Sequence, residues 1–191
     1  MVRRKAKLHR RFLRSTRGVA AVEFAIMLPI LVTLFLASVD AARAIAIYTK
    51  VRAASYVLDA ITNQYTTIQS ADMSAILGAT SVVLAPYSSS PVTVVLSQIK
   101  VSSATSAAVN WSATLNGTAL TQKNPITVPT NFASCSSYPC YLIYGQVSYT
   151  YTPLFLYFTK SAITLSDSLY ATPRVSECIL YPPQSITSSP C

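Results

Sequence analysis

The fold of this chain is decided by the stretch at residues 17–40, RGVAAVEFAIMLPILVTLFLASVD, which holds a long apolar run between Arg17 and Asp40. Between Val19 and Val39 the only ionisable side chain is Glu23. With Gly18 the run has 22 residues, and a helix of that length spans roughly 33 Å, enough for a hydrocarbon core of about 30 Å. The run lacks the alternation of a strand, so it predicts a transmembrane helix over residues 19–39.

Positive charge is concentrated ahead of this run. Of the 15 basic residues in the 191-residue chain, eight lie in residues 1–18, which hold no acid. The rest of the chain has 7 basic and 6 acidic residues, so the net charge of +9 falls to +1 there. This pattern indicates a basic leader that stays in the cytoplasm, with the chain from Asp40 onward outside; a solvated tail is the alternative. A nucleic-acid partner is not expected, because the basic residues are not spread over a folded surface.

A cleaved secretory signal is a second interpretation of the apolar run. Such signals have an apolar region of about 7–15 residues followed by small residues at the cleavage site. Val39-Asp40-Ala41 is an acceptable site, but the run is longer than a signal needs and carries Glu23. Its length and its charge therefore favour a spanning helix.

The helical pattern continues beyond the span. Apolar residues recur every three or four positions and form one stripe: Ala44, Ile47, Val51, Ala54, Leu58 and Ile61. The charged residues fall off this stripe: Arg43, Lys50, Arg52 and Asp59. The pattern predicts one long helix from about Val19 to about Gln64. Its outer half belongs to an external amphipathic helix extension over residues 40–78.

The composition changes at residue 79, where Ser, Thr, Val and Tyr begin to dominate. Alternating patterns predict strands at residues 91–101, 107–115, 141–152 and 161–175, and Asn116-Gly117 is a hairpin-type turn signal. We therefore expect an external, mostly-β domain over residues 79–191 with a Cys-containing C-terminal tail. The predicted fold class is α+β, in which the external half of the long helix packs on a small antiparallel sheet.

The external part carries no recognisable catalytic or metal-binding pattern. The only histidine, His9, lies in the basic leader, so no Ser-His pair, Cys-His pair or His metal ligand is available beyond the span. The acidic residues after the span are scattered, and a chain with four glycines has no phosphate-binding glycine loop. We therefore predict that the protein is not an enzyme and holds no cofactor or metal.

The four cysteines all lie in the external part: Cys135, Cys140, Cys178 and Cys191. In an oxidising compartment they predict disulfides, with free structural thiols as the alternative. Four cysteines allow three pairings. The local pairing, Cys135–Cys140 with Cys178–Cys191, closes the shortest loops at the lowest cost in chain entropy.

Glu23 is the costly residue of the span, and a carboxylate at such a position marks a functional site. In the intact chain it could reach the cytoplasmic interface beside Arg17. If the chain is cut after Gly18, Val19 becomes the first residue and gains a free α-amino group. Glu23 of one subunit could then face the amine of a neighbour, so that the pair fixes the register of stacked helices.

This arrangement resembles the type IV prepilins, in which a basic leader ends in Gly and an apolar helix follows with Glu at its fifth position. More closely, the chain resembles the TadE/TadG-like family, the minor pseudopilins of tight-adherence (Flp) pili. The matching residues are Gly18, Ala21-Val22-Glu23-Phe24-Ala25 and Leu28-Pro29. Residues 147–155, 163–165 and 171–174 also look like the tail of that family.

The resemblance implies a bacterial inner-membrane protein with one membrane pass, a cytoplasmic N-terminus and a periplasmic C-terminal domain. It implies cleavage between Gly18 and Val19 by a prepilin peptidase, although many type IV prepilins have Phe or Met where Val19 stands. The implied partners are other pilin and pseudopilin subunits and the inner-membrane assembly platform. The implied role is to prime, cap or assemble the pilus. A permanently anchored scaffold or partner-binding protein of the same machinery is the alternative.

Overall fold

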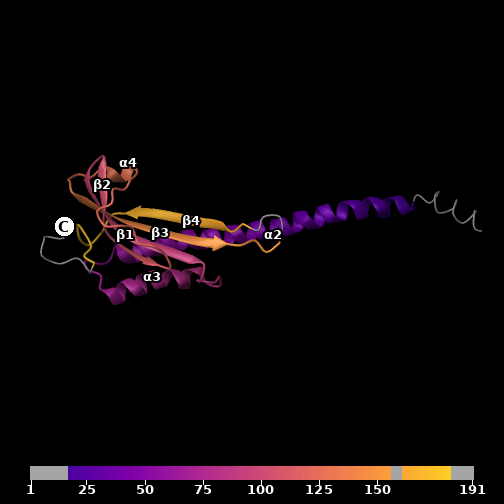
Figure 1. Cartoon of the computed structure of the whole chain (residues 1–191), viewed down its shortest axis with the longest axis horizontal. Helices are drawn as coiled ribbons and strands as arrows, with labels where there is room; N and C mark the ends of the chain where they lie inside the picture. Colours follow the sequence, from indigo (N-terminus) through magenta and orange to yellow (C-terminus); the bar gives the residue numbers. More distant parts are fainter. Residues whose placement is uncertain (1–16, 156–160, 182–191) are drawn as a thin grey trace, which may run out of the picture. The chain divides into compact units, whose positions relative to one another are not determined.

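The computed structural model describes residues 17–155 and 161–181, which fall into two compact units. The first unit contains residues 17–42 and 153–155, and the second contains residues 43–152 and 161–181. Helix α2 (Arg17–Thr62) supplies residues to both and is continuous through Pro29 (Figure 1). The helix expected from about Val19 to about Gln64 is therefore confirmed to within two residues at each end.

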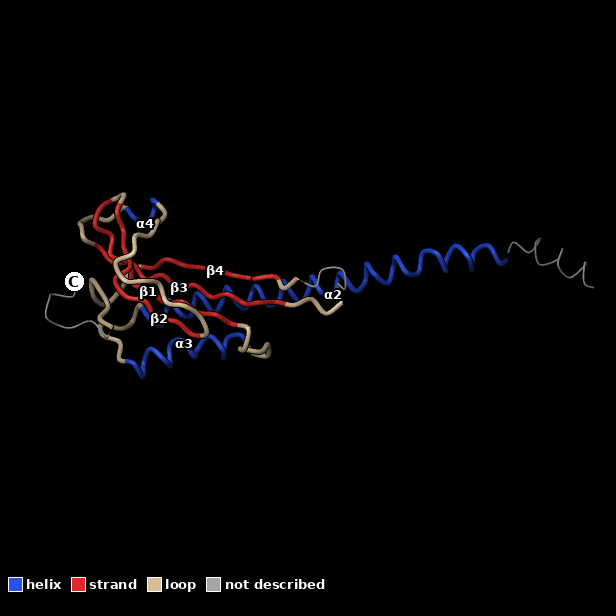
Figure 2. Tube along the Cα trace, viewed as in Figure 1, coloured by secondary structure: helices blue, strands red, loops and turns tan. Residues whose placement is uncertain are grey.

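The second unit is built on a four-stranded antiparallel sheet with the order β2-β1-β3-β4 (Figure 2). The four strands are β1 (Val92–Ser103), β2 (Ser106–Leu115), β3 (Cys140–Tyr151) and β4 (Ile163–Ala171). Each overlaps one of the strands expected from alternation. A long apolar helix packed on a small antiparallel sheet confirms the α+β class.

The apolar stripe of α2 packs on one face of this sheet. Ile47, Val51, Ala54 and Leu58 are buried, and Ala44 and Ile61 pack against the same core. The sheet contributes alternate residues of its strands to this core, including Val92, Val94, Leu96, Ile143 and Val147. The stripe predicted from the sequence is therefore the surface by which α2 joins the sheet.

Asp59 does not follow the prediction, which placed it off the stripe. Its side chain is only 2% exposed and lies beside Leu58 in the interface between α2 and β3. The residue opposite it is Gly145, whose missing side chain leaves room for the carboxylate between the helix and the strand. The helix therefore buries a wider face than its apolar residues alone indicate.

The extension expected over residues 40–78 consists of two helices. Between them, Ile68 is fully buried, and its N–H donates to the Leu180 carbonyl at 2.8 Å. Helix α3 (Ser70–Leu84) then starts where the Asp72 carboxylate accepts the Gln69 N–H at 3.2 Å. It continues through Gly78, because Met73, Ile76, Leu77, Thr80 and Leu84 are buried along one side.

The connection after β2 corrects the expectation of a hairpin at Asn116-Gly117. Asn116 has a φ of 56°, but the chain then leaves the sheet instead of forming the next strand. The N–H of Val109 donates to Asn124 at 3.0 Å, and the N–H of Ile126 donates to Ala107 at 3.0 Å. These bonds hold the connection beside β2, and it continues through the short helix α4 (Thr130–Ala133) to β3.

Residues 178–181 are part of the core, although their sequence has no strand or helix pattern. Cys178 and Ile179 are 2% and 1% exposed. The indole N–H of Trp111 donates to the Ile179 carbonyl at 2.8 Å, and the ring of Tyr181 lies 5.4 Å from that of Trp111. These contacts fasten the segment to the end of the sheet core.

The structure contains a disulfide between Cys135 and Cys140, with their Cα atoms 6.4 Å apart. Cys178 is also disulfide-bonded. The partner expected for it, Cys191, lies outside the described residues, so the Cys178–Cys191 bond stays a prediction.

The close approach of α2 to Gly145 generates a stability prediction. A Cβ at position 145 would overlap the Asp59 carboxylate and lie 3.3 Å from Leu58 Cδ2. We expect Gly145→Ala to lower the free energy of unfolding by about 1–3 kcal/mol, the usual cost of overpacking. Thermal unfolding of the full chain in detergent, followed by near-ultraviolet circular dichroism, measures the change.

Gly78→Ala is the matched control, because nothing lies within 4 Å of a Cβ at this position in the middle of α3. It should raise the free energy of unfolding by about 0.5–1 kcal/mol through helix propensity. An unchanged melting temperature in Gly145→Ala would contradict the close contact between Asp59 and β3.

Candidate membrane and assembly site

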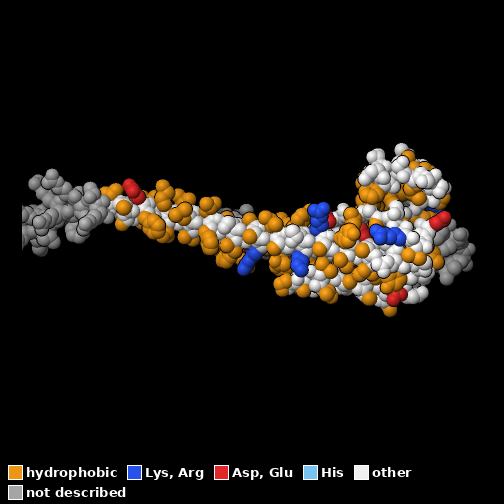
Figure 3. Space-filling view, turned by 180° about the vertical axis from the view of Figure 1, so that it is seen from behind, with side chains coloured by type: hydrophobic (Ala, Val, Ile, Leu, Met, Phe, Trp, Pro, Cys, Tyr) orange, Lys and Arg blue, Asp and Glu red, His pale blue; other side chains and the backbone are white. Residues whose placement is uncertain are grey.

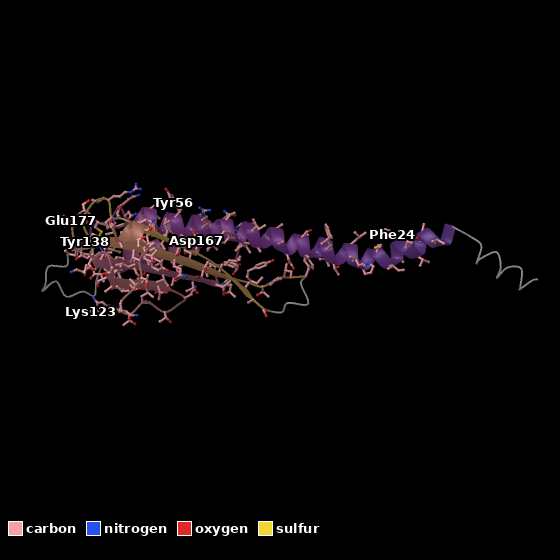
Figure 4. All side chains as sticks on the ribbon, turned by 90° about the horizontal axis from the view of Figure 1, so that it is seen from above. Phe24, Tyr56, Lys123, Tyr138, Asp167 and Glu177 are labelled. Carbon is pink, nitrogen blue, oxygen red and sulfur yellow. A yellow bond between two sulfur atoms is a disulfide. The ribbon has the colours of Figure 1, made fainter. Side chains whose placement is uncertain are left out.

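The first part of α2 presents apolar side chains on all sides. None of its most apolar stretch is buried. Figure 3 shows hydrophobic side chains along this segment, and Phe24 projects from the helix in Figure 4. Among the described residues, α2 is the one helix long and apolar enough to cross a membrane. A helix that is apolar all round needs an apolar surrounding, which is consistent with single-pass membrane anchoring.

The predicted processing residues lie at the start of this helix. Gly18 and Val19 are both exposed, and nothing lies within 4 Å of a Cβ built on Gly18. Glu23 follows on the same helix and is also exposed. Within residues 17–155 and 161–181, no hydrogen bond or ion pair of Glu23 is present. Gly18, Val19 and Glu23 therefore lie exposed within the first two turns of α2.

Asp40 is a polar feature of the first unit that the sequence did not single out. It directly follows the last residue of the apolar run, and its side chain is 1% exposed. The backbone N–H of Leu154 donates to its Oδ1 at 3.1 Å, and that of Phe155 donates to its Oδ2 at 2.8 Å. The carboxylate thus ties the segment after β3 to the end of the apolar helix. The sequence signal that could have identified Asp40 is its position as an acidic residue directly after the apolar run.

Asp59 is the second buried carboxylate and belongs to the second unit. Desolvation by burial raises the pKa of Asp59 from 3.8 to about 8. Neither carboxyl oxygen has a hydrogen-bond partner among the described residues. Because burying an ionised carboxylate without a partner is costly, Asp59 holds a proton at neutral pH. The group is therefore a neutral part of the interface between α2 and β3.

The described residues offer little for catalysis. No group of three or more His, Cys, Asp or Glu side chains is placed to hold a metal in residues 17–155 and 161–181. A solvent-open cavity of 620 Å³ lies between the turn after β1, residues 125–128 and α4. Its lining consists of Ser, Thr, Ala, Pro, Ile and Val residues. Hydroxyls without an adjacent base or acid make a poor nucleophilic site.

These observations describe an α+β protein with one N-terminal apolar helix that is consistent with single-pass membrane anchoring. Residues 18–57 match the model of the family described as TadE-like protein. The chain therefore carries a TadE-like N-terminal segment, which confirms the resemblance of its N-terminal motifs and indicates involvement in the assembly of tight-adherence pili. The resemblance of the later stretches lies outside the matched residues and stays a prediction. Proteins of this family are typically structural rather than catalytic. No curated protein and no solved structure matches the chain.

The raised pKa of Asp59 generates a pH prediction. In the unfolded chain the carboxyl ionises near its ordinary value of 3.8, whereas in the fold it keeps its proton up to about 8. Its contribution to stability is therefore complete below about pH 4 and is lost progressively as the pH rises to about 8. Asp59→Asn cannot ionise, so we expect it to stabilise the fold relative to wild type, and more at about pH 8.5 than at about pH 5.

Urea unfolding of the two proteins at both pH values measures this difference. Glu177→Gln is the matched control, because it removes one carboxylate from an exposed position of the same unit. An identical pH dependence in wild type and Asp59→Asn would show that the Asp59 carboxyl is not neutral in the fold.

Proposed function

We propose that the protein is a minor pseudopilin of a tight-adherence pilus assembly system, with a non-catalytic role in priming, capping or assembling the pilus. The observation that carries the proposal is Glu23, a carboxylate exposed on an apolar helix within the TadE-like segment. A carboxylate in a lipid span costs free energy, so its presence calls for a partner that the chain acquires on assembly.

Cleavage after Gly18 supplies that partner. It removes the basic leader and leaves Val19 with an α-amino group, whose ordinary pKa of about 8 keeps it largely protonated at neutral pH. The Glu23 carboxylate of one subunit then pairs with the amine of the next. Misplacing such a pair in lipid costs more than forming it gains, so the pair sets the register of neighbouring helices rather than adding much stability.

The compartment follows from the charge of the leader. The basic residues 1–18 stay in the cytoplasm and direct the second unit to the periplasm of the inner membrane. The Cys135–Cys140 disulfide supports an oxidising location for that unit. In this orientation the partners are a prepilin peptidase, other pilin and pseudopilin subunits, and the inner-membrane assembly platform. Incorporation into a surface pilus would follow cleavage.

The alternative is a permanently anchored scaffold of the same machinery that keeps its leader. Val19 favours this alternative, because many type IV prepilins have Phe or Met at that position. The scaffold would use Glu23 at the cytoplasmic interface, beside its own leader. The state of the N-terminus separates the two proposals.

Replacing the residue before the cut tests processing. We expect Gly18→Val to leave the full-length precursor in the membrane, because a branched side chain replaces hydrogen at the cleaved bond. Gly18→Ala is the matched control, since it changes the same residue while adding only one methyl group. Intact mass and N-terminal sequencing of the purified proteins give the result. A wild-type protein that keeps Met1 in pilus-forming cells would favour the permanent scaffold.

Replacing Glu23 tests the pairing. Glu23→Gln keeps the size of the side chain and removes its charge, which eases membrane insertion by up to about 3 kcal/mol on insertion scales. We therefore expect unchanged or higher membrane levels together with a loss of pilus assembly, measured by immunoblotting and by counting pili in electron micrographs. Normal piliation in Glu23→Gln cells would refute a role for the charge.

A further inference from the structure

Asp40 lies on α2 at the point where the apolar run ends, and it makes a polar contact that has no part in the proposed function. Asp40 follows Val39 directly, so its Cα lies about 1.5 Å along the helix axis from the last residue of the apolar run. A carboxylate at the boundary of the hydrocarbon core is costly unless hydrogen bonds satisfy it. The N–H groups of Leu154 and Phe155 supply these bonds, one to each carboxylate oxygen.

The same two bonds fix the depth of the segment that provides them. Residues 153–155 follow β3 in the chain and belong to the same compact unit as residues 17–42. The two oxygens of one carboxylate accept hydrogen bonds from two consecutive residues. This pair of bonds restrains both the position of the segment along the axis of α2 and its rotation. The segment is therefore held at the end of the apolar run.

The side chains of the two residues held beside the end of the apolar run are apolar and exposed. Leu154 is 65% exposed and Phe155 is 44% exposed. Three more apolar residues follow in the sequence, Leu156, Tyr157 and Phe158, and lie outside the described residues. Large exposed apolar side chains beside a membrane span are stabilised by entering the boundary between headgroups and acyl chains.

We propose that Leu154 and Phe155 form a second membrane contact, which inserts into the leaflet where α2 leaves the bilayer and is held there by Asp40. The partner is the lipid bilayer itself, because the contact is continuous with the end of the spanning helix. Asp40 acts as a positioning residue: its carboxylate holds the backbone of the segment, while the two side chains meet the lipid. The proposal rests on single-pass anchoring and is independent of any role in a pilus.

Quenching of tryptophan fluorescence by brominated lipid tests the contact. The full chain carrying Phe155→Trp is reconstituted at low protein density in phosphatidylcholine vesicles brominated near the headgroup end of the acyl chains. The native Trp111 adds a constant background, since it is only 3% exposed. Val82→Trp is the matched control, because it places a tryptophan at a site of the second unit that is 76% exposed.

We expect the bromines to quench the Phe155→Trp chain at least about twofold more than the Val82→Trp chain, as insertion at the interface requires. Adding Asp40→Asn to the Phe155→Trp chain replaces one acceptor oxygen by an amide donor, so quenching should fall toward the control while the circular dichroism spectrum stays unchanged. That loss would assign the positioning role to the Asp40 carboxylate rather than to the fold as a whole.

Two results would overturn the proposal. Equal quenching of the Phe155→Trp and Val82→Trp chains would show that the segment stays out of the lipid. Shielding of the introduced tryptophan in the Phe155→Trp chain that grows with protein density, and not with lipid bromination, would show that a neighbouring copy of the chain covers it. Either result would leave the cleavage after Gly18 and the role of Glu23 untouched.

Discussion

The packing of one stripe of α2 against one face of the sheet is the interaction on which the second unit depends. Ile47, Val51 and Leu58 meet Leu96 and other buried residues of the strands in a single core. The opposite face has only a small second core of its own, formed by Ile99, Val101, Ala133 and Leu142 with their partly buried neighbours. Because helices supply much of the larger core, the sheet has no equivalent partner for its apolar face without α2. The helix whose first part is apolar enough to cross a membrane is therefore also the helix that completes the core of the second unit.

Three carboxylates on this helix show how position decides what an acid does. Glu23 is exposed on an all-apolar segment, Asp40 is satisfied by two backbone N–H groups, and Asp59 is buried without a partner for its oxygens among the described residues. Their surroundings differ accordingly: the apolar stretch leaves Glu23 without a polar neighbour among the described residues, backbone N–H groups stabilise the Asp40 carboxylate, and burial raises the pKa of Asp59. Of the three, Asp40 holds a neighbouring segment through hydrogen bonds to the backbone N–H groups of Leu154 and Phe155. The role of Glu23 in pairing stays a proposal.

The sequence by itself determined those features that depend on local periodicity. The span, the stripe from Ala44 to Ile61 and the four strands were predictable, because burial on one face imposes a period of 3.6 on a helix and 2 on a strand. The processing site at Gly18 and the pairing role of Glu23 also come from local spacing in the sequence, and both stay predictions. The Cys135–Cys140 loop is similarly local, since only four residues separate the two cysteines.

Only the tertiary structure decided which residues pack against each face of the helices and strands. Asp59 is buried because Gly145, on a strand more than eighty positions later, leaves room for it. After Thr62 the chain leaves the helix, and backbone hydrogen bonds join Thr66 and Ile68 to Leu180. Ile179 is held in the core by the hydrogen bond that the Trp111 indole donates to its carbonyl. The contact between Asp40 and Leu154 joins residues 114 positions apart. A sequence pattern records which side chains seek burial, but the partner that buries them is set by the three-dimensional packing of the whole chain.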